Sequence, residues 1–475
     1  MSTTTTTPTT RTAATGPVLT KSDPSSGQVL RAFPAARAEE VEAAVGRATA
    51  AFPSWAAAGS VRRGDVVHRL AALIDAHRAE LVASITAEHG KPLADARGEV
   101  ERAAALLRFA AGSGRRMGGQ TLPSDTPHTA SATLRRPVGP VALITPWNFP
   151  LAIPAWKLGP ALVAGCTAVL KPSPLAPRTA ELLVELAVTA GVPDGVVSVV
   201  QGDGVTGELL VSDPAIRAVS FTGSVDVGRA IHRASTRTMA RTQLEMGGKN
   251  AVIVCEDADL DRAAAAIVHG AFGQSGQRCS ATSRVIAHAR IHDELVARIV
   301  ERATRLRPGP PDDPRSDLGP LISEDAMRRC LDAVRASERD GGTVRCGGTR
   351  TGSVGCFVLP TVITGLGPDA PLARTEVFGP VLVVLEAPSL EEAIAIGNSV
   401  PYGMSAAIFT AGIRSVARFV AEADAGMLHV NRAGTGAFPH MPHVGTKASQ
   451  FGPAECSEEG LDFFLETRTV TIDAS

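Results

Sequence analysis

The feature that most constrains the fold is a repeated order of buried strand, turn and helix that begins near residue 139. Short uncharged runs rich in Val, Ile and Ala alternate with longer segments whose apolar residues recur at helical spacing. Strands that alternate with helices form a parallel sheet covered on both faces, so the sequence predicts an α/β fold. The predicted strands are 140–145, 167–171, 196–200, 218–221 and, ending the set, 251–255, and the predicted helices are 152–164, 178–190 and 227–240.

A second α/β section is expected from about 257 to 445. In the final stretch, 465–472, β-branched residues alternate with other residues, which predicts a strand. We expect this strand to lie outside both cores and to pair with another part of the protein or with another subunit. The predicted helices of the second section are 259–272, 293–305, 323–339 and 390–398, and its strands lie near 284–287, 381–385, 405–409 and 427–430. Helices are also predicted upstream, at 41–58, 61–89 and 93–111.

Composition narrows the classes of function. A chain of 475 residues is too long for one simple core, so two or three domains are expected. The net charge of −1 and the aromatic content of 4% offer no basic or stacking surface, so neither nucleic acid nor membrane is an expected partner. The longest uncharged run, 137–156, contains five prolines, which disfavour a transmembrane helix.

The cysteines and the N-terminus indicate where the protein works. Seven cysteines fit neither a disulfide framework nor a zinc site, which predicts a reducing, cytoplasmic compartment and no metal. The threonine-rich start, 1–15, lacks the basic and apolar regions of a signal peptide, so we expect a disordered tail.

Cys279 is the leading candidate for a nucleophile. Small residues surround it in the run 273–280, which allows another molecule to approach the backbone, and the adjacent Arg278 is expected to favour its thiolate. Glu245, beside a glycine pair, supplies a carboxylate that can activate water. A thiol and such a carboxylate are sufficient for covalent acyl chemistry, whereas a cysteine taken alone is more often a small buried hydrophobe.

Two loops after predicted strands carry further candidates. Asn148, in the hydrophobic loop 145–150, can donate its amide to an oxyanion together with the backbone N–H of Cys279, although a plain turn residue is the alternative. Lys171 ends a strand at the sheet edge where nucleotides bind, with a solvated surface lysine as the alternative.

Two glycine-bearing segments compete as phosphate sites. The FTGS segment, 221–224, opens a helix whose first backbone N–H groups can bind pyrophosphate, and Gly228 lets that helix approach the strand. A capped helix without a ligand is the alternative. The run 202–207 fits G-x-G-x-x-G, but no strand-ending acid follows about 20 residues later, so it is the weaker candidate.

Taken together and in order, these segments resemble the aldehyde dehydrogenase superfamily. The resemblance covers about 23 to 472 and rests on PWNFP (146–150), KPS (171–173), FTGS with a following Gly (221–228), LEMGGKN (244–250), GQRC (276–279), EVFGP (376–380) and TRTV (467–470). It implies a Rossmann-type parallel-sheet cofactor domain, an α/β catalytic domain and a small β oligomerisation arm. The implied division is 16–118 with 139–246 for NAD(P) binding, 247–447 for catalysis, 119–138 with 463–475 for the arm, and 448–462 for a return segment.

The resemblance also implies residue roles. Cys279 matches the nucleophile, Glu245 the general base, Asn148 the oxyanion-hole amide, and Glu455 a second acid sometimes assigned to proton relay. Residues that match or neighbour contacts of NAD or NADP are Ile144, Thr145, Pro146, Trp147, Lys171, Ser173, Pro174, Phe221, Gly223, Ser224, Gly228, Glu376 and Phe378. Residues expected around the substrate are Phe149, Ile153, Trp156, Arg278, Ser280, Phe438, His440 and His443.

The implied reaction is NAD(P)-dependent oxidation of an aldehyde to a carboxylic acid. Cys279 forms a thiohemiacetal and then a thioester, which water activated by Glu245 hydrolyses. Relatives that pass the acyl group to coenzyme A usually lack that glutamate, so its presence favours hydrolysis. The alternatives are a reductase of activated acyl groups and a retired structural or binding homologue, although the latter is expected to have lost such residues. A homodimer or homotetramer is expected.

Within the superfamily the chain is most similar to the α-ketoglutarate semialdehyde dehydrogenase group. The similarity lies in GEVERAA (98–104), PWNFPLAIPAWKLGPAL (146–162), GQRCSATSRVI (276–286) and HVN…PHMP…K (429–447). It implies a short aldehyde that carries an acid group, with Arg278 as the best-placed cation and His440 and His443 as helpers. An unusual biosynthetic aldehyde, aromatic or amino, is the alternative.

Two departures from the family pattern affect the expected ligands. His443-Val444-Gly445 stands where Phe-Gly-Gly is usual, so His443 replaces an aromatic that commonly walls the substrate tunnel. Pro174 stands where NAD-selective members often carry a glutamate for the adenosine ribose. Because no carboxylate at that position repels a 2′-phosphate, we expect NADP to be accepted, with Lys171, Ser173 or Arg178 as its ligands.

Overall fold

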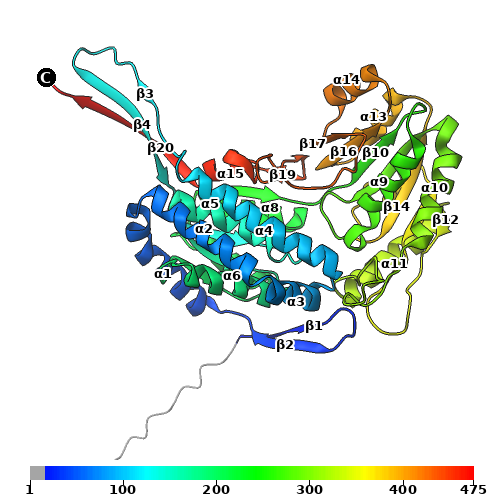
Figure 1. Cartoon of the computed structure of the whole chain (residues 1–475), viewed down its shortest axis with the longest axis horizontal. Helices are drawn as coiled ribbons and strands as arrows, with labels where there is room; N and C mark the ends of the chain where they lie inside the picture. The colour runs from blue at the N-terminus through cyan, green and yellow to red at the C-terminus, as the bar shows by residue number, and fades with distance from the viewer. Residues whose placement is uncertain (1–15) are drawn as a thin grey trace, which may run out of the picture.

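The structure is a computed structural model in which residues 16–475 are described (Figure 1). The predicted tail, 1–15, lies outside the described residues. Two α/β bodies, each built on its own sheet, lie side by side, and a thin β arm extends from one of them. No helix between residues 16 and 475 combines the length and the apolar character that a membrane span requires.

The first body is a six-stranded sheet in the order β19-β9-β8-β5-β6-β7. All neighbours are parallel except the short edge strand β19, which runs antiparallel to β9. Every residue of β5, β6 and β8 is buried, because helices cover both faces, and this explains their unbroken apolar runs. The strands are β5 (Pro140–Ile144), β6 (Thr167–Lys171), β7 (Val197–Val199), β8 (Ala218–Thr222), β9 (Arg241–Glu245) and β19 (Gln450–Phe451).

Alternate residues of each strand serve different helices. Val141 and Leu143 of β5 pack with one helical layer, whereas Ala142 and Ile144 pack with the other. The larger layer comprises α2 (Ser60–Ala76), α3 (Arg78–His89), α4 (Leu93–Ser113), α5 (Ala152–Ala164), α6 (Pro177–Thr189) and α15 (Ser457–Asp462). The smaller layer comprises α1 (Ala38–Ala57), α7 (Gly204–Ser212) and α8 (Val225–Ser235).

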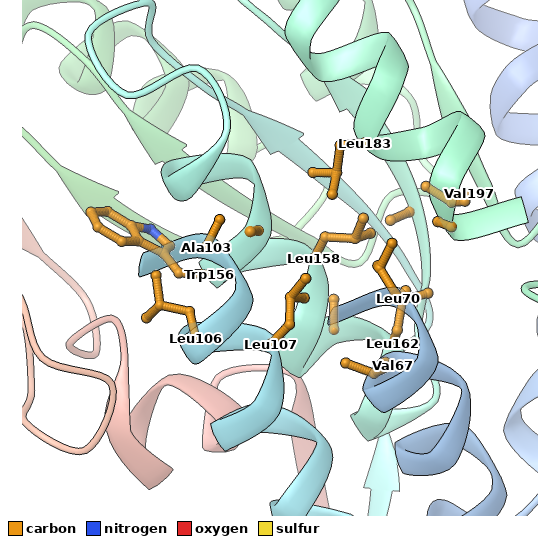
Figure 2. Close-up of a cluster of buried hydrophobic side chains, with 14 of the residues drawn as sticks. Val67, Leu70, Ala103, Leu106, Leu107, Trp156, Leu158, Leu162, Leu183 and Val197 are labelled. Carbon is orange, nitrogen blue, oxygen red and sulfur yellow. The ribbon is translucent and has the colours of Figure 1, made fainter. Parts of the chain in front are cut away.

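Helices α2, α4 and α5 meet in a close-packed core. Figure 2 shows Leu70, Leu107 and Leu158 from these three helices converging in one cluster, with Leu183 of α6 beside them. Glycine at 159 favours this approach, because a Cβ there would lie 3.0 Å from Leu107 Cδ2, closer than most Cβ contacts. This core fixes the position of α5, which directly follows the loop of Asn148.

The second body is a seven-stranded sheet in the order β12-β13-β14-β11-β10-β16-β17, parallel except for β12 against β13. Its strands are β10 (Asn250–Val254), β11 (Thr282–His288), β12 (Thr343–Cys346), β13 (Thr361–Thr364), β14 (Val381–Ala387), β16 (Ser405–Phe409) and β17 (Met427–Val430). Helices α9 (Leu260–Phe272) and α10 (His292–Arg305) pack on one face. The other face packs against α11 (Glu324–Arg339), α12 (Pro371–Arg374), α13 (Leu390–Asn398) and α14 (Ile413–Glu422).

Three small β units complete the fold. The arm is an antiparallel sheet in the order β20-β4-β3, formed by β3 (Thr121–Leu122), β4 (Thr129–Pro137) and β20 (Leu465–Asp473), and it extends away from the first body (Figure 1). The C-terminal strand therefore pairs with β4 of its own chain. A hairpin joins β1 (Val18–Ser22) to β2 (Val29–Pro34), and β15 (Tyr402–Gly403) pairs with β18 (Thr446–Lys447).

The structure corrects several sequence predictions. The predicted helix 61–89 is two helices, α2 and α3, because the backbone leaves the helical region at His77 (φ −96°, ψ 20°). The strand at 250–254 pairs with β11 and β16, so it belongs to the second sheet and does not end the first. The predicted helix 227–240 ends at Ser235. Elements that were not predicted include the helices α7, α12, α14 and α15 and the strands β1, β3, β9, β12, β13, β15, β18 and β19.

Two of these elements were missed for a clear physical reason. Helix α7 contains Gly204 and Gly207, which disfavour helix by propensity, but Asp203 caps its start by accepting from the backbone N–H of Val205 at 2.9 Å. Strand β9 reads as polar, yet its last three residues are buried because it lies between β8 and β19.

Candidate active site

Cys279 lies in a strained turn between α9 and β11. Gln274, Ser275 and Gly276 have φ of 53°, 55° and 72°, in the left-handed region. Only glycine fits at 276, because a Cβ there would lie 2.2 Å from the carbonyl oxygen of Gly379. The carbonyl oxygen of Cys279 accepts a hydrogen bond from Asn250 Nδ2 at 2.7 Å.

Asn250 is a positioning residue that sequence reasoning missed. Its side chain also donates to Ala281 O at 2.9 Å and accepts from the backbone N–H of Ser405 at 2.9 Å. It therefore ties the cysteine turn to the start of β10 and β16. The only signal in the sequence was its place at the end of the LEMGGKN motif.

The thiol of Cys279 is in a neutral, desolvated environment. Burial, followed by the nearby carboxyl groups of Glu245 and Glu376, raises its pKa to about 12. The nearby Arg278 does not bring this pKa below its usual value, contrary to the expectation from the sequence. The Arg278 guanidinium turns back over Gly273 and donates to His269 O at 2.9 Å, so it satisfies a carbonyl instead of the sulfur.

Glu245 ends β9 and is almost completely buried. Neither carboxylate oxygen has a hydrogen-bond partner among the described residues. Burial, and then the carboxyl group of Glu455, raises its pKa well above the usual value, while Lys157 opposes the shift. Glu455 forms a buried ion pair with Lys157 and lies 3.1 Å from Ser220 Oγ. Glu455 and Glu245 are thus brought into one buried group.

A buried ion pair, between Lys91 and Glu99, holds the backbone of Asn148. Lys91 Nζ donates to Glu99 at 2.5 Å and to Asn148 O at 2.8 Å. Glu99 in turn accepts from the backbone N–H groups of Leu151 and Ala152 at 2.9 and 3.1 Å, at the start of α5. The Asn148 amide donates to Gln277 O at 3.2 Å, in the turn that leads to Cys279. Sequence reasoning missed Lys91 and Glu99, because neither forms a motif with 148–152.

A groove of about 710 Å³ runs along the carboxyl ends of β5, β6 and β8. Of the predicted cofactor residues, those that line it are Ile144, Thr145, Pro146, Trp147, Lys171, Ser173, Pro174, Phe221, Gly223 and Ser224. The hydroxyls of Thr145 and Thr222 are buried without a partner among the described residues. These free hydroxyls and the open start of α8 fit a dinucleotide with its phosphates at the helix. Gly204 and Gly207 also line the groove.

Three predicted cofactor residues lie beside the groove instead of lining it. Glu376 accepts from Gly248 N at 3.0 Å, and burial raises its pKa to about 7. Phe378 packs edge-on against Trp147, with ring centroids 5.5 Å apart. Gly228 allows α8 to approach Met246, whose sulfur would lie 2.5 Å from a Cβ at that position.

A separate cavity of about 270 Å³ opens onto Cys279. Its lining includes the predicted residues Phe149, Ile153, Trp156, Arg278, Ser280, Phe438 and His443. His440 does not line it, and its ring lies beside that of Phe438 at a centroid distance of 6.2 Å. Arg102 of α4 and Arg432, just after β17, line the cavity but were not predicted, because only the fold brings these helix and loop positions to the cysteine. Within residues 16–475, no Asp or Glu lines this cavity.

Comparison with known proteins identifies this arrangement. The sequence profile of the Aldehyde dehydrogenase family matches residues 11–470. The chain belongs to the aldehyde dehydrogenase family. This aldehyde dehydrogenase is 40% identical, over 91% of each chain, to a 2,5-dioxopentanoate dehydrogenase of Saccharolobus solfataricus. It is 38% identical to an alpha-ketoglutarate semialdehyde dehydrogenase of Haloferax volcanii, over 97% of this chain and 96% of that one.

The fold comparison agrees. The crystal structure of betaine aldehyde dehydrogenase from Staphylococcus aureus in complex with NAD⁺ superposes with a TM-score of 0.94 at 30% identity, covering 97% of this chain and 92% of that one. The predicted aldehyde dehydrogenase resemblance and the α/β fold class are therefore confirmed. The protein is an NAD(P)-dependent oxidoreductase of aldehydes.

The buried Lys91–Glu99 pair yields a prediction about the Asn148 loop. Lys91→Met or Glu99→Gln alone should lower the free energy of unfolding by about 3–5 kcal/mol, because the remaining partner is buried without its counter-charge. Both changes should also lower kcat, since Asn148 loses its anchor. The double variant should lose clearly less stability than the sum of the two losses. Urea unfolding followed by Trp fluorescence measures the energies.

The matched control for this cycle is the exposed Arg115–Asp65 pair. Arg115→Met removes an ion pair between exposed side chains and should cost about 0–1 kcal/mol. Strictly additive losses for Lys91 and Glu99 would contradict a coupled pair.

Proposed function

We propose that this enzyme oxidises a short aldehyde that carries a carboxylate, with a five-carbon 2-oxo acid semialdehyde as the leading candidate. The observation that carries the proposal is the charge of the substrate cavity, where Arg102, Arg278 and Arg432 surround the approach to Cys279 without any acidic residue in the lining. Arginine is the side chain best suited to bind a carboxylate. The relatives named 2,5-dioxopentanoate dehydrogenase and alpha-ketoglutarate semialdehyde dehydrogenase support the same substrate class, since both names describe an aldehyde with an acid group.

We assign the chemical steps to the residues around Cys279. The Cys279 sulfur attacks the aldehyde carbon, and the Asn148 amide and a backbone N–H stabilise the oxyanion. When bound, NAD(P) supplies the acceptor for the hydride. Glu245 then activates the water that hydrolyses the thioester. Burial and Glu455 raise the pKa of Glu245 and favour its protonated form, so we assign removal of its proton to the adjacent Glu455 with Lys157.

Removal of the proposed base should isolate the acyl-enzyme. Glu245→Gln should still transfer one hydride per active site but slow turnover by about 10²–10⁴-fold, because no group activates water. Stopped-flow absorbance at the NADH band should show a burst equal to the enzyme concentration. Cys279→Ala should show no burst. A Glu245→Gln enzyme with neither burst nor turnover would place this residue before hydride transfer and contradict the assignment.

The arginines should set the preference among aldehydes. Arg102→Met and Arg432→Met should each lower kcat/KM for a carboxylate-bearing semialdehyde by about 10–100-fold, the loss of a charged hydrogen bond of about 1.5–3 kcal/mol. They should leave kcat/KM for neutral aliphatic aldehydes nearly unchanged. Arg97→Met, on the exposed face of the same helix α4, is the control. A wild-type preference for neutral or aromatic aldehydes in this panel would refute the proposed substrate.

We propose that NADP is accepted as well as NAD. Pro174 lines the groove beside Lys171 and Ser173, where a carboxylate would repel a 2′-phosphate. Asp203, Glu208 and Asp226 also line the groove, and the Asp203 carboxylate caps α7. Arg178, the third expected ligand, pairs with Glu185 at 2.5 Å and does not line the groove.

The ratio of kcat/KM for the two cofactors tests this proposal. The wild-type enzyme should use both, and Pro174→Glu should lower kcat/KM for NADP about tenfold or more relative to NAD, because the new carboxylate faces the phosphate. Arg178→Met should change neither value if Lys171 and Ser173 are the ligands. Strict use of NAD by the wild type would contradict the proposal.

We further propose a cytoplasmic homodimer or homotetramer assembled through the β arm. Leu122, Leu134 and Ile472 of the arm are exposed, and its edge strands have free hydrogen-bonding groups, which supports pairing with another copy. We also propose the division into 16–118 with 139–246, 247–447, the arm at 119–138 with 463–475, and a return segment at 448–462, which the presence of separate sheets supports.

A further inference from the structure

His443 lies directly beside the reactive sulfur. Its Nε2 is 3.9 Å from Cys279 Sγ, and within residues 16–475 no other side chain is within hydrogen-bonding distance of that sulfur. We propose that His443 is a catalytic residue that takes the thiol proton of Cys279 as the sulfur attacks the aldehyde. The inference rests on the proposed role of Cys279 as nucleophile and adds a residue to it.

The surroundings of Cys279 make such a proton acceptor necessary. The thiol is protonated at neutral pH, since its pKa is raised to about 12 by burial and by the carboxyl groups of Glu245 and Glu376. The charge of Arg278 does not outweigh these effects, and its guanidinium binds the His269 carbonyl instead of the sulfur. Burial and the Glu455 carboxyl raise the pKa of Glu245, which favours its protonated form, and the described side chain within hydrogen-bonding distance of the sulfur is His443. A neutral imidazole is therefore the suitable base within reach.

The imidazole is held in place and kept neutral. Two backbone hydrogen bonds to Glu455, of 2.8 and 3.1 Å, fix the His443 main chain. The ring packs against Trp156, with ring centroids 5.4 Å apart. Its pKa is lowered to about 4 by burial and by the positive charges of Lys157 from α5 and Arg102 from α4. The ring is therefore unprotonated between pH 6 and 9, with a lone pair free on one ring nitrogen.

The proton and electron balance of the step is complete. The S–H bond breaks and the S–C bond forms, the carbonyl electron pair moves to oxygen, and the proton moves to His443 Nε2 to give an imidazolium. After hydride transfer and attack of water, the C–S bond breaks. The leaving thiolate then takes the proton back from the imidazolium, so the pair is ready for another cycle. The negative oxygen of the tetrahedral adduct stabilises the imidazolium beside it.

The test replaces the imidazole with the aromatic ring that resembles the family pattern. His443→Phe keeps a ring against Trp156 but cannot accept a proton. At pH 7, with saturating cofactor, single-turnover formation of NADH should slow about 10²-fold or more. The deficit should shrink by about tenfold per pH unit as hydroxide generates the thiolate, whereas the wild-type rate stays flat between pH 6 and 9. Unchanged Tm and cofactor Kd show that the variant is folded.

Two further variants separate catalysis from packing. His443→Ala should also be slow, and free imidazole should raise its single-turnover rate about tenfold by occupying the vacated space as a base. His68→Phe, an exposed histidine of α2, is the matched control and should behave as wild type. A wild-type rate and pH profile for His443→Phe would show that His443 only lines the cavity, and this result would overturn the proposal. The role of Cys279 fails separately, if Cys279→Ala still forms NADH.

Discussion

The active site depends on a four-residue crossing between the two sheets. Strand β9 ends at Glu245 and β10 begins at Asn250, so residues 246–249 must carry the chain from one body to the other. The crossing is possible only with little bulk. A Cβ at Gly247 would lie 2.1 Å from Glu376 Oε2, and one at Gly248 would lie 2.9 Å from Cys279 O. This short connection places the carboxylate of Glu245 and the amide of Asn250 on either side of the cysteine turn.

Desolvation governs the resting chemistry of that site. Burial raises the pKa values of Cys279, Glu245 and Glu376 and lowers that of His443, so each of these groups is favoured in its uncharged form. The main exceptions lie at the edges of the site, where Lys157 pairs with Glu455 and Lys91 pairs with Glu99. Removing water from a site of neutral groups costs little free energy, because no isolated charge is desolvated. In such a site, proton transfers accompany bond formation instead of preceding it.

The substrate cavity, unlike the group of neutral side chains around Cys279, is lined by positively charged residues. Arg102, Arg278 and Arg432 reach it from α4, from the cysteine turn and from the loop after β17. Of these three, Arg102 helps to lower the pKa of His443, which lies beside the sulfur. Recognition of an anionic substrate and the neutrality of the imidazole are therefore linked through the same arginine.

The sequence by itself determined the strands and helices whose patterns are local and the motifs that lie in single loops. β6, α5, α13, β16 and β17 follow directly from apolar runs and helical spacing, and ten predicted cofactor residues line one groove because strand ends meet at one sheet edge. Only the tertiary structure decided which sheet holds 250–254, where Arg278 points, and that Lys91, Glu99, Arg102, Asn250 and Arg432 belong to the site. The physical reason is that distances and burial between residues far apart in the chain set these contacts and the pKa values, and no local pattern encodes them.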